Sequence, residues 1–427
     1  MDAAITRFTL SNGLLVVLKE VHTAPLVSHW IWYRVGSRDE VPGGTGLSHW
    51  VEHMQFKGTP RYPTGVLDKA ISRNGGVWNA FTYLDWTAYF ETLPANQIGL
   101  AMQIEADRMT ESLFDLNEFE AERAVIISER EGNENEPTFR LAEEVQAAAF
   151  RVHAYHHETI GDMADLETIQ RDDLYHHYRA YYAPNNAVLT IAGDFETAAM
   201  IQDVREYYEP IPSGSHVLRR VRPEPDQTGQ RSIQVEGPGE TVYLEAAYHI
   251  PPAEHADFLA LNVMDSLLSG PSDLSIFGGG LSNKTSRLYQ ALVENELAVS
   301  VFGGMQATID PYLYNLSIVV HPESSPEAVM AALDQEISRL QETLPTVEEL
   351  ARAVKQARAL FAYGTESITN QAAWLGFVEM FADQTWLSGY LDQLSMVSPQ
   401  DVQRVAQTYL RQQNRVLGTY IPTGVQA

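Results

Sequence analysis

Cysteine is absent from the 427-residue chain, and basic side chains are scarce, with 29 Lys and Arg against 56 Asp and Glu. The lack of cysteine excludes disulfide bonds, a thiolate nucleophile and cysteine-based metal sites. The formal net charge of −27 argues against nucleic acid, whose phosphates require a basic face, and against docking on an anionic membrane. The acidity fits either simple solubility or an acidic interior that attracts cationic ligands.

Long apolar runs are also missing, since none approaches the roughly 18 residues that a membrane span requires. The first residues show no basic segment followed by an apolar one, so no signal peptide is predicted. We therefore expect a cytoplasmic protein without membrane association, or a periplasmic one if a leader has been removed. The length predicts two or three domains.

The expected elements mix strands with helices. Asn12-Gly13 between two apolar runs predicts a β-hairpin. Further strands are expected at 27–35, 77–81 and 87–93, and helices at 47–56, 64–74, 95–110 and 117–132, with Thr64 and Asn117 as caps. Strands and helices do not alternate strictly, so the predicted fold class is α+β rather than a doubly wound parallel sheet.

Two segments of the chain resemble each other. They are Tyr181 with Asn186-Ala187-Val188-Leu189, and Tyr409 with Asn414-Arg415-Val416-Leu417. A polar, Pro-rich stretch between them is typical of a linker. We predict two homologous domains, each a mostly antiparallel sheet covered by helices. Residues 1–212 would form the first domain, 213–230 the linker, and 231–427 the second, homologous domain.

The segment His49-Trp50-Val51-Glu52-His53 carries the chemistry. On a helix, His49 and His53 share a face, so both imidazoles can reach one metal ion. Glu52 lies beside that face, where its carboxylate can take a proton from a metal-bound water without being a ligand. The pattern is H-x-x-E-H, the mirror image of the H-E-x-x-H zinc motif. The alternative is a pair of capping or surface histidines.

A catalytic zinc site takes three protein ligands and keeps one position for water. The segment 122–129 offers the third ligand, because Glu122 and Glu129 are seven residues apart and project from one helical face. A carboxylate on a helix held in the core is well placed for a metal. Most helix glutamates are solvated, however, so spacing alone leaves Glu129 undecided.

With these motifs the sequence resembles the pitrilysin, insulin-degrading enzyme and mitochondrial processing peptidase family of zinc metallopeptidases, the inverzincins, as a short two-domain subunit of bacterial type. In that family an E-R-x-V-I-x-x-E run follows the histidine helix at the separation found here, and its last Glu is a ligand. The resemblance covers nearly the whole chain. It implies Zn²⁺ held by His49, His53 and Glu129, with Glu52 as general base and Glu122 as an accessory acid.

The family also has an N-A-x-T strand whose edge receives the substrate backbone. Asn79, Ala80, Phe81 and Thr82 match this strand. The resemblance therefore implies β-augmentation, in which main-chain hydrogen bonds provide affinity with little side-chain selectivity. Taken alone, the four residues fit an ordinary edge strand equally well.

The second half departs from the active pattern. Its segment 257–268 has no histidine, and Val293 and Val299-Ser300 stand where active family members carry an Arg and a Tyr. We expect a zinc metalloendopeptidase that acts on peptides or unfolded segments. A homologous zinc-free subunit would donate Arg and Tyr in a heterodimer, and the chain on its own would form at most a homodimer. Two alternatives stay open: a non-catalytic core subunit kept for assembly, and a zinc-containing peptide-binding protein without turnover.

Overall fold

The expected hairpin is present in the computed structural model, which describes residues 5–217, 219, 221–274 and 281–424. Gly13 N–H donates to the Leu10 carbonyl at 3.0 Å, and Asn12 Oδ1 accepts from Leu14 N–H at 3.2 Å. The turn joins strands β1 (Ile5–Thr9) and β2 (Leu15–Glu20), which pair antiparallel.

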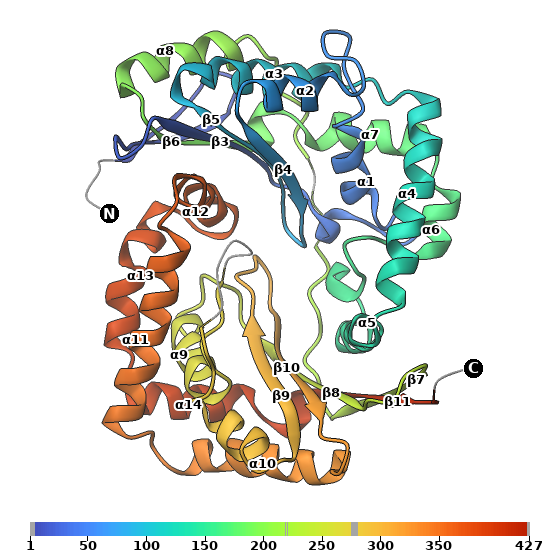
Figure 1. Ribbon diagram of the computed structural model, residues 1–427, viewed down its shortest axis with the longest axis vertical. Coiled ribbons are helices and arrows are strands. Elements are labelled where there is room, and N and C mark those ends of the chain that lie inside the picture. Colours follow the sequence, from blue (N-terminus) through green and yellow to red (C-terminus); the bar gives the residue numbers. More distant parts are fainter. Residues whose placement is uncertain (1–4, 218, 220, 275–280, 425–427) are drawn as a thin grey trace. The chain divides into compact units, whose positions relative to one another are not determined.

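The first sheet has six strands in the order β1-β2-β6-β3-β5-β4. Its other strands are β3 (Leu26–Tyr33), β4 (Val77–Thr82), β5 (Thr87–Pro94) and β6 (Ala187–Gly193). Only β2 and β6 pair in parallel. The central strands β3 and β6 are apolar almost throughout because both faces of the sheet are covered. Helices α3 (Ile98–Glu111) and α8 (Thr197–Tyr208) lie on one face and α12 (Ile368–Phe381) on the other (Figure 1).

The second sheet repeats this topology with five strands in the order β7-β11-β8-β10-β9. They are β7 (Arg231–Gly237), β8 (Tyr243–Ile250), β9 (Ala298–Met305), β10 (Tyr312–Val320) and β11 (Arg415–Pro422). The repeat begins at β2 in the first sheet and at β7 in the second. β2 pairs in parallel with β6, the last strand of its repeat, and β7 pairs in parallel with β11, while the remaining pairs are antiparallel. The predicted α+β fold with two homologous sheets is confirmed.

An asparagine explains the sequence echo between the halves. Asn186 Nδ2 donates to the Tyr181 carbonyl at 2.8 Å, and Asn414 Nδ2 donates to the Tyr409 carbonyl at 2.8 Å. Each side chain ties the end of a helix, α7 (Arg171–Tyr181) or α14 (Pro399–Tyr409), to the strand that follows. The bond satisfies a helix-terminal carbonyl that has no partner within the helix.

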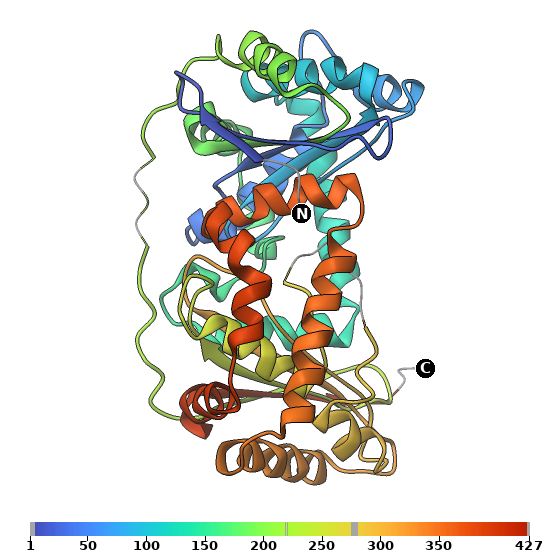
Figure 2. The ribbon, with the colours of Figure 1, turned by 90° about the vertical axis from the view of Figure 1, so that its left-hand side faces the viewer.

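The compact units are not continuous along the chain. Unit 1 comprises residues 1–131, 157–222 and 365–384, and unit 2 comprises 132–156, 223–364 and 385–427. Thus α5 (Pro137–Ala149) packs on the second sheet, and α12 packs on the first (Figures 1 and 2). The expected ranges 1–212 and 231–427 differ from these units because each sheet is covered by a helix from the other half. As limits of the sequence repeat, those ranges stay a prediction.

Gly376 shows how closely α12 approaches the first sheet. A Cβ at this position would lie 2.0 Å from Trp32 Nε1, so no larger residue fits without movement. In the expected linker, residues 213–217, 219 and 221–230 form neither helix nor strand (Figure 2). One of the boundaries between the units falls within this stretch, after Arg222.

The remaining helices follow the sequence expectations closely in the first half. They are α1 (Leu47–Met54), α2 (Val66–Arg73), α4 (Leu116–Glu134), α6 (Met163–Thr168), α9 (Phe258–Leu268), α10 (Pro326–Glu342), α11 (Val347–Gly364) and α13 (Gln384–Met396).

The expected caps are wrong. Asp115 Oδ1, not Asn117, accepts from the backbone N–H of Asn117 and Glu118 at the start of α4. Thr64 donates to the Lys57 carbonyl instead of capping α2. None of the helices in the described residues has the length and apolar character needed to cross a bilayer.

Candidate metal centre

Helix α1 begins at a buried ionic cap. The Glu40 carboxylate accepts from Gly46 N–H at 2.8 Å and Ser48 N–H at 2.7 Å, and His157 Nε2 lies 3.1 Å from Glu40 Oε2. Both side chains are buried. Burial raises the pKa of Glu40, but the hydrogen bond to His157 lowers it, and the net shift is downward. The carboxylate is therefore ionised, and its negative charge is stabilised by the positive end of the helix dipole. Gly46 itself has φ +87°, which favours glycine. The cap fixes the turn that carries His49.

The three expected ligands come together. One ligand atom from each of His49, His53 and Glu129 lies within 4.8 Å of the others. Glu129 Oε1 is 3.9 Å from His49 Nε2, and Glu129 Oε2 is 3.7 Å from His53 Nε2. Tetrahedral zinc with ligands at its usual bond lengths separates them by about 3.3 Å. The two distances from Glu129 to the imidazoles thus exceed the tetrahedral value by a few tenths of an ångström, and the chemistry of the donor set fits zinc.

The protonation of His49 also suits a metal ligand. Burial, with a contribution from the neighbouring His53, lowers the pKa of His49 to about 3. Its imidazole is therefore neutral at physiological pH, and a neutral imidazole is the form that binds metal.

Glu122 lies behind His53, on the side away from Glu129. His53 Nδ1 is 2.9 Å from Glu122 Oε2, and Lys57 Nζ forms an ion pair with Glu122 Oε1. Although burial opposes it, the hydrogen bonds from His53 and Lys57 lower the pKa of Glu122. Burial also opposes protonation of His53, but the hydrogen bond to Glu122 and the nearby carboxylates raise its pKa. The expected accessory acid thus contacts a candidate ligand directly.

Glu52 lies between the histidines and the first sheet. Its Oε2 accepts from Thr82 Oγ1 at 2.6 Å. Burial raises the pKa of Glu52 to about 7, even though the Thr82 hydrogen bond lowers it. A carboxylate with this pKa can both accept and release a proton near neutral pH.

The expected substrate strand is β4, at the end of the first sheet. Asn79 is exposed, Ala80 is buried and Phe81 is half-buried. Asn79 Oδ1 accepts from Ala80 N–H at 2.9 Å. This main-chain donor is therefore satisfied by the side chain of the preceding residue.

Sequence reasoning missed three contributors: Lys57, and the Glu40–His157 pair. Lys57 lies four residues after His53, the spacing at which side chains share one helical face. This spacing could have indicated that Lys57 lies near the histidines. Glu40 and His157 are far apart in the chain, and no local pattern connects them.

A second group with metal-binding geometry is present among the described residues, on the surface of unit 1: Glu20, His22 and Glu196. Its imidazole is already used, because His22 Nδ1 lies 2.6 Å from Asp194 Oδ1 and His22 Nε2 lies 2.9 Å from Glu20 Oε1. We interpret this group as surface ion pairs.

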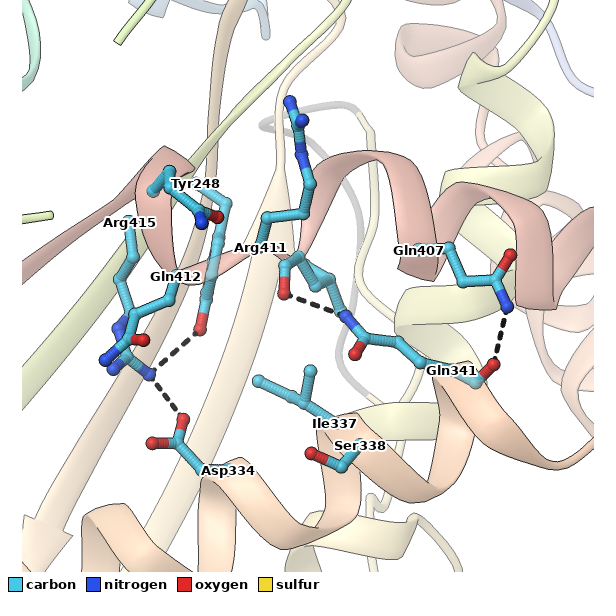
Figure 3. A pocket seen from close by; sticks show the side chains of 11 residues that line it. Tyr248, Asp334, Ile337, Ser338, Gln341, Gln407, Arg411, Gln412 and Arg415 are labelled. Atoms are coloured by element: carbon cyan, nitrogen blue, oxygen red, sulfur yellow. Dashed lines mark hydrogen bonds and ion pairs between the residues drawn. The ribbon is translucent and has the colours of Figure 1, made fainter. Parts of the chain in front are cut away.

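Unit 2 holds no counterpart of the histidine pair in its described residues. All 11 residues of α9 are buried, and none is histidine. Unit 2 does contain a polar pocket of about 400 Å³ near the end of α14 (Figure 3). Gln341 Nε2 donates to the carbonyls of Ala406 and Leu410, and Arg415 pairs with Asp334. These contacts join α10 to α14 and β11, so we assign the pocket lining a structural role.

Two family models match the chain. The model described as insulinase, peptidase family M16, matches residues 15–163, and the model described as the peptidase M16 inactive domain matches residues 168–357. The chain belongs to the peptidase M16 family, so the recognition made from its motifs is confirmed. All the candidate site residues lie within the insulinase match.

Individual relatives match over nearly the whole chain. The zinc protease PqqE of Helicobacter pylori is 27% identical, over 94% of this chain and 89% of the relative. The mitochondrial-processing peptidase subunit beta of Lentinula edodes is 25% identical, over 96% and 89%. The crystal structure of a protease from Helicobacter pylori superposes with a TM-score of 0.91 at 26% identity, covering 98% of this chain and 100% of that one.

Proposed function

We propose that the protein is a zinc-dependent metalloendopeptidase that hydrolyses peptides or unfolded protein segments. The observation that carries the proposal is the cluster of His49, His53 and Glu129 beside the Glu52 carboxylate. Zn²⁺ bound by those three side chains would act as a Lewis acid, polarising the scissile carbonyl and making water more acidic. The names of the zinc proteases among the relatives support the choice of metal.

Glu52 is the general base in this proposal. Its pKa of about 7 leaves a substantial fraction ionised at neutral pH, ready to take a proton from the attacking water. The same carboxyl group then delivers the proton to the leaving amine. Thr82 Oγ1, 2.6 Å from Glu52 Oε2, keeps the carboxylate directed between α1 and β4.

The edge of β4 binds the substrate backbone in the same proposal. Ala80 N–H is the donor available to a substrate carbonyl, once that carbonyl replaces Asn79 Oδ1. Pairing through the main chain selects for an extended conformation rather than for a side chain. This selection favours peptides and unfolded segments as substrates.

A homologous zinc-free subunit is the partner we propose. Val293, Val299 and Ser300 offer neither a cation nor a phenol to stabilise an oxyanion. One relative is itself named as a subunit, the mitochondrial-processing subunit beta. We expect peptide cleavage by the chain alone to be weak and to rise at least tenfold when a homologue carrying Arg and Tyr is added. Full activity of the isolated chain, unchanged by the homologue, would contradict the partner proposal.

The metal assignment is tested by zinc content. The purified chain should hold about one zinc, and His53→Ala should abolish the binding because two protein ligands are too few for a stable site. Elemental analysis after dialysis at neutral pH measures the stoichiometry. Stoichiometric zinc in His53→Ala would show that the ligands are assigned wrongly. Zinc binding without peptide cleavage, with or without a homologue, would favour the peptide-binding alternative.

A further inference from the structure

The two histidines of the metal centre are supported unequally. His49 Nδ1 is buried and has no hydrogen-bond partner among the described residues, whereas His53 Nδ1 contacts Glu122. A metal-bound imidazole generally donates its other N–H to a carboxylate or carbonyl, which fixes the ring and raises its basicity. In this site the Glu122 carboxylate provides such a contact, and it provides it to His53 and not to His49.

Both oxygens of Glu122 have a partner. Oε2 lies 2.9 Å from His53 Nδ1, and Oε1 forms the ion pair with Lys57. The Glu122 side chain is only 6% exposed. Removing one partner from a carboxylate this buried leaves a charge that is poorly compensated. Without Lys57, the Glu122 carboxylate would lose the contact that fixes one of its oxygens and could rotate, which would weaken its hold on His53.

We propose that Lys57 is a positioning residue of the metal centre. It holds Glu122 by one oxygen so that the other orients His53 with Nε2 toward Glu129, 3.7 Å away. Lys57 thus acts through Glu122 and touches no metal ligand in this role. The inference rests on the zinc site proposed above and adds a residue that sets its affinity.

The backbone contacts of Lys57 do not depend on its side chain. Its N–H donates to the Met54 carbonyl, and its carbonyl accepts from Thr64 Oγ1. Lys57→Met keeps these contacts and most of the aliphatic stem while removing the charge, and Lys57→Arg keeps the charge. Lys69→Met is the matched control, since Lys69 is an exposed lysine of α2 and its loss changes the net charge equally.

The experiment measures the zinc dissociation constant of the full chain by competition with a chelator at pH 7.5 and fixed ionic strength. Lys57→Met should weaken zinc binding by at least several-fold and by up to about 100-fold, since 10- to 100-fold is the usual effect of losing the direct partner of a ligand, here the Glu122 contact to His53. Lys57→Arg should recover most of the affinity, and Lys69→Met should match the wild type. Melting temperatures of the zinc-free variants verify that each is folded.

A double-mutant cycle separates positioning from general damage. If Lys57 acts through Glu122, adding Lys57→Met to Glu122→Gln should cause no further loss of affinity. The inference is overturned if the two losses add, if Lys57→Met binds zinc as the wild type does, or if Lys69→Met weakens binding equally. A wild-type chain that binds no zinc would instead refute the proposed function.

Discussion

Helices α1 and α9 follow the second strand of their repeats and so occupy the same place in a repeated topology. All 11 residues of α9 are buried. In α1, by contrast, His49, Glu52 and His53 are partly exposed, and only the opposite side packs into the core. The two helices differ in which side chains they present, while the sheets beneath them keep the same strand order.

The comparison shows that unit 1 holds buried ionisable groups around the candidate metal centre. It holds Glu40 against His157 in a buried ion pair, and it keeps Glu52 where burial opposes ionisation. Buried charges are costly unless they are paired and hydrogen-bonded. In unit 2 the corresponding helix packs mainly through apolar residues, but burial also raises the pKa of its Asp265 to about 6, so the two helices differ in the histidine pair rather than in the presence of a buried acid.

The largest effect is expected when α1 loses the proposed general base, as α9 has no such base. Glu52→Gln should lower the rate of peptide cleavage at least about 100-fold, because an amide cannot accept the proton from water. Zinc content should stay unchanged, since Glu52 is not among the proposed ligands. Steady-state kinetics with elemental analysis on the same preparation measures both. A variant with wild-type activity would reduce Glu52 to a structural residue.

A second prediction concerns the helix that covers each sheet. Gly376→Ala places a methyl group against the Trp32 indole and should destabilise unit 1 by about 1–3 kcal/mol, because the core must shift to accept it. The control is Gly132→Ala in α4, where a Cβ meets nothing within 4 Å. Denaturant unfolding measures both free energies. Equal stabilities would mean that α12 yields without strain.

A third prediction concerns the pH dependence of the stability of the zinc-free chain. Because the pKa of Glu52 is raised to about 7 in the folded state, folded protein holds a proton that unfolded protein has released. This preference stabilises the fold at low pH and is lost as pH rises from the ordinary glutamate value to about 7. Glu52→Gln removes the ionisation and should be more stable than wild type at pH 8, by up to about 3 kcal/mol.

The control for this effect is built into the pH series. Near pH 4 both side chains are neutral, so the stability difference between the two proteins should vanish. Urea unfolding at both pH values, with a chelator present, gives the comparison. A difference that does not change with pH would show that Glu52 ionises normally in the folded chain.

Much of the candidate site follows from local spacing. His49, Glu52 and His53 lie within two turns of one helix, and Glu122 and Glu129 lie on one face of another, so helical geometry predicts their directions. That Glu129 reaches the histidines is a tertiary fact, which the sequence indicated only through the family resemblance.

What the sequence could not predict depends on distant segments. The Glu40–His157 cap joins two loops, and nothing local distinguishes Glu40 from a solvated acid. The sequence also did not predict that α5 packs on the second sheet and α12 on the first. An apolar pattern shows that a helix is buried, but not which sheet it covers. Asp115 caps α4 two residues earlier than expected, an error within the ordinary uncertainty of helix ends.

The alternation of the units along the chain has a consequence for synthesis on the ribosome. The proposed metal ligands and every strand of the first sheet have been made once residue 193 is complete, but α12 begins at Ile368. Until then the face of that sheet that includes Trp32 lacks α12, the helix that packs on it. Complete packing of unit 1 during translation therefore waits for most of the polypeptide, and an early stop would release the candidate metal site on a sheet with an uncovered apolar face.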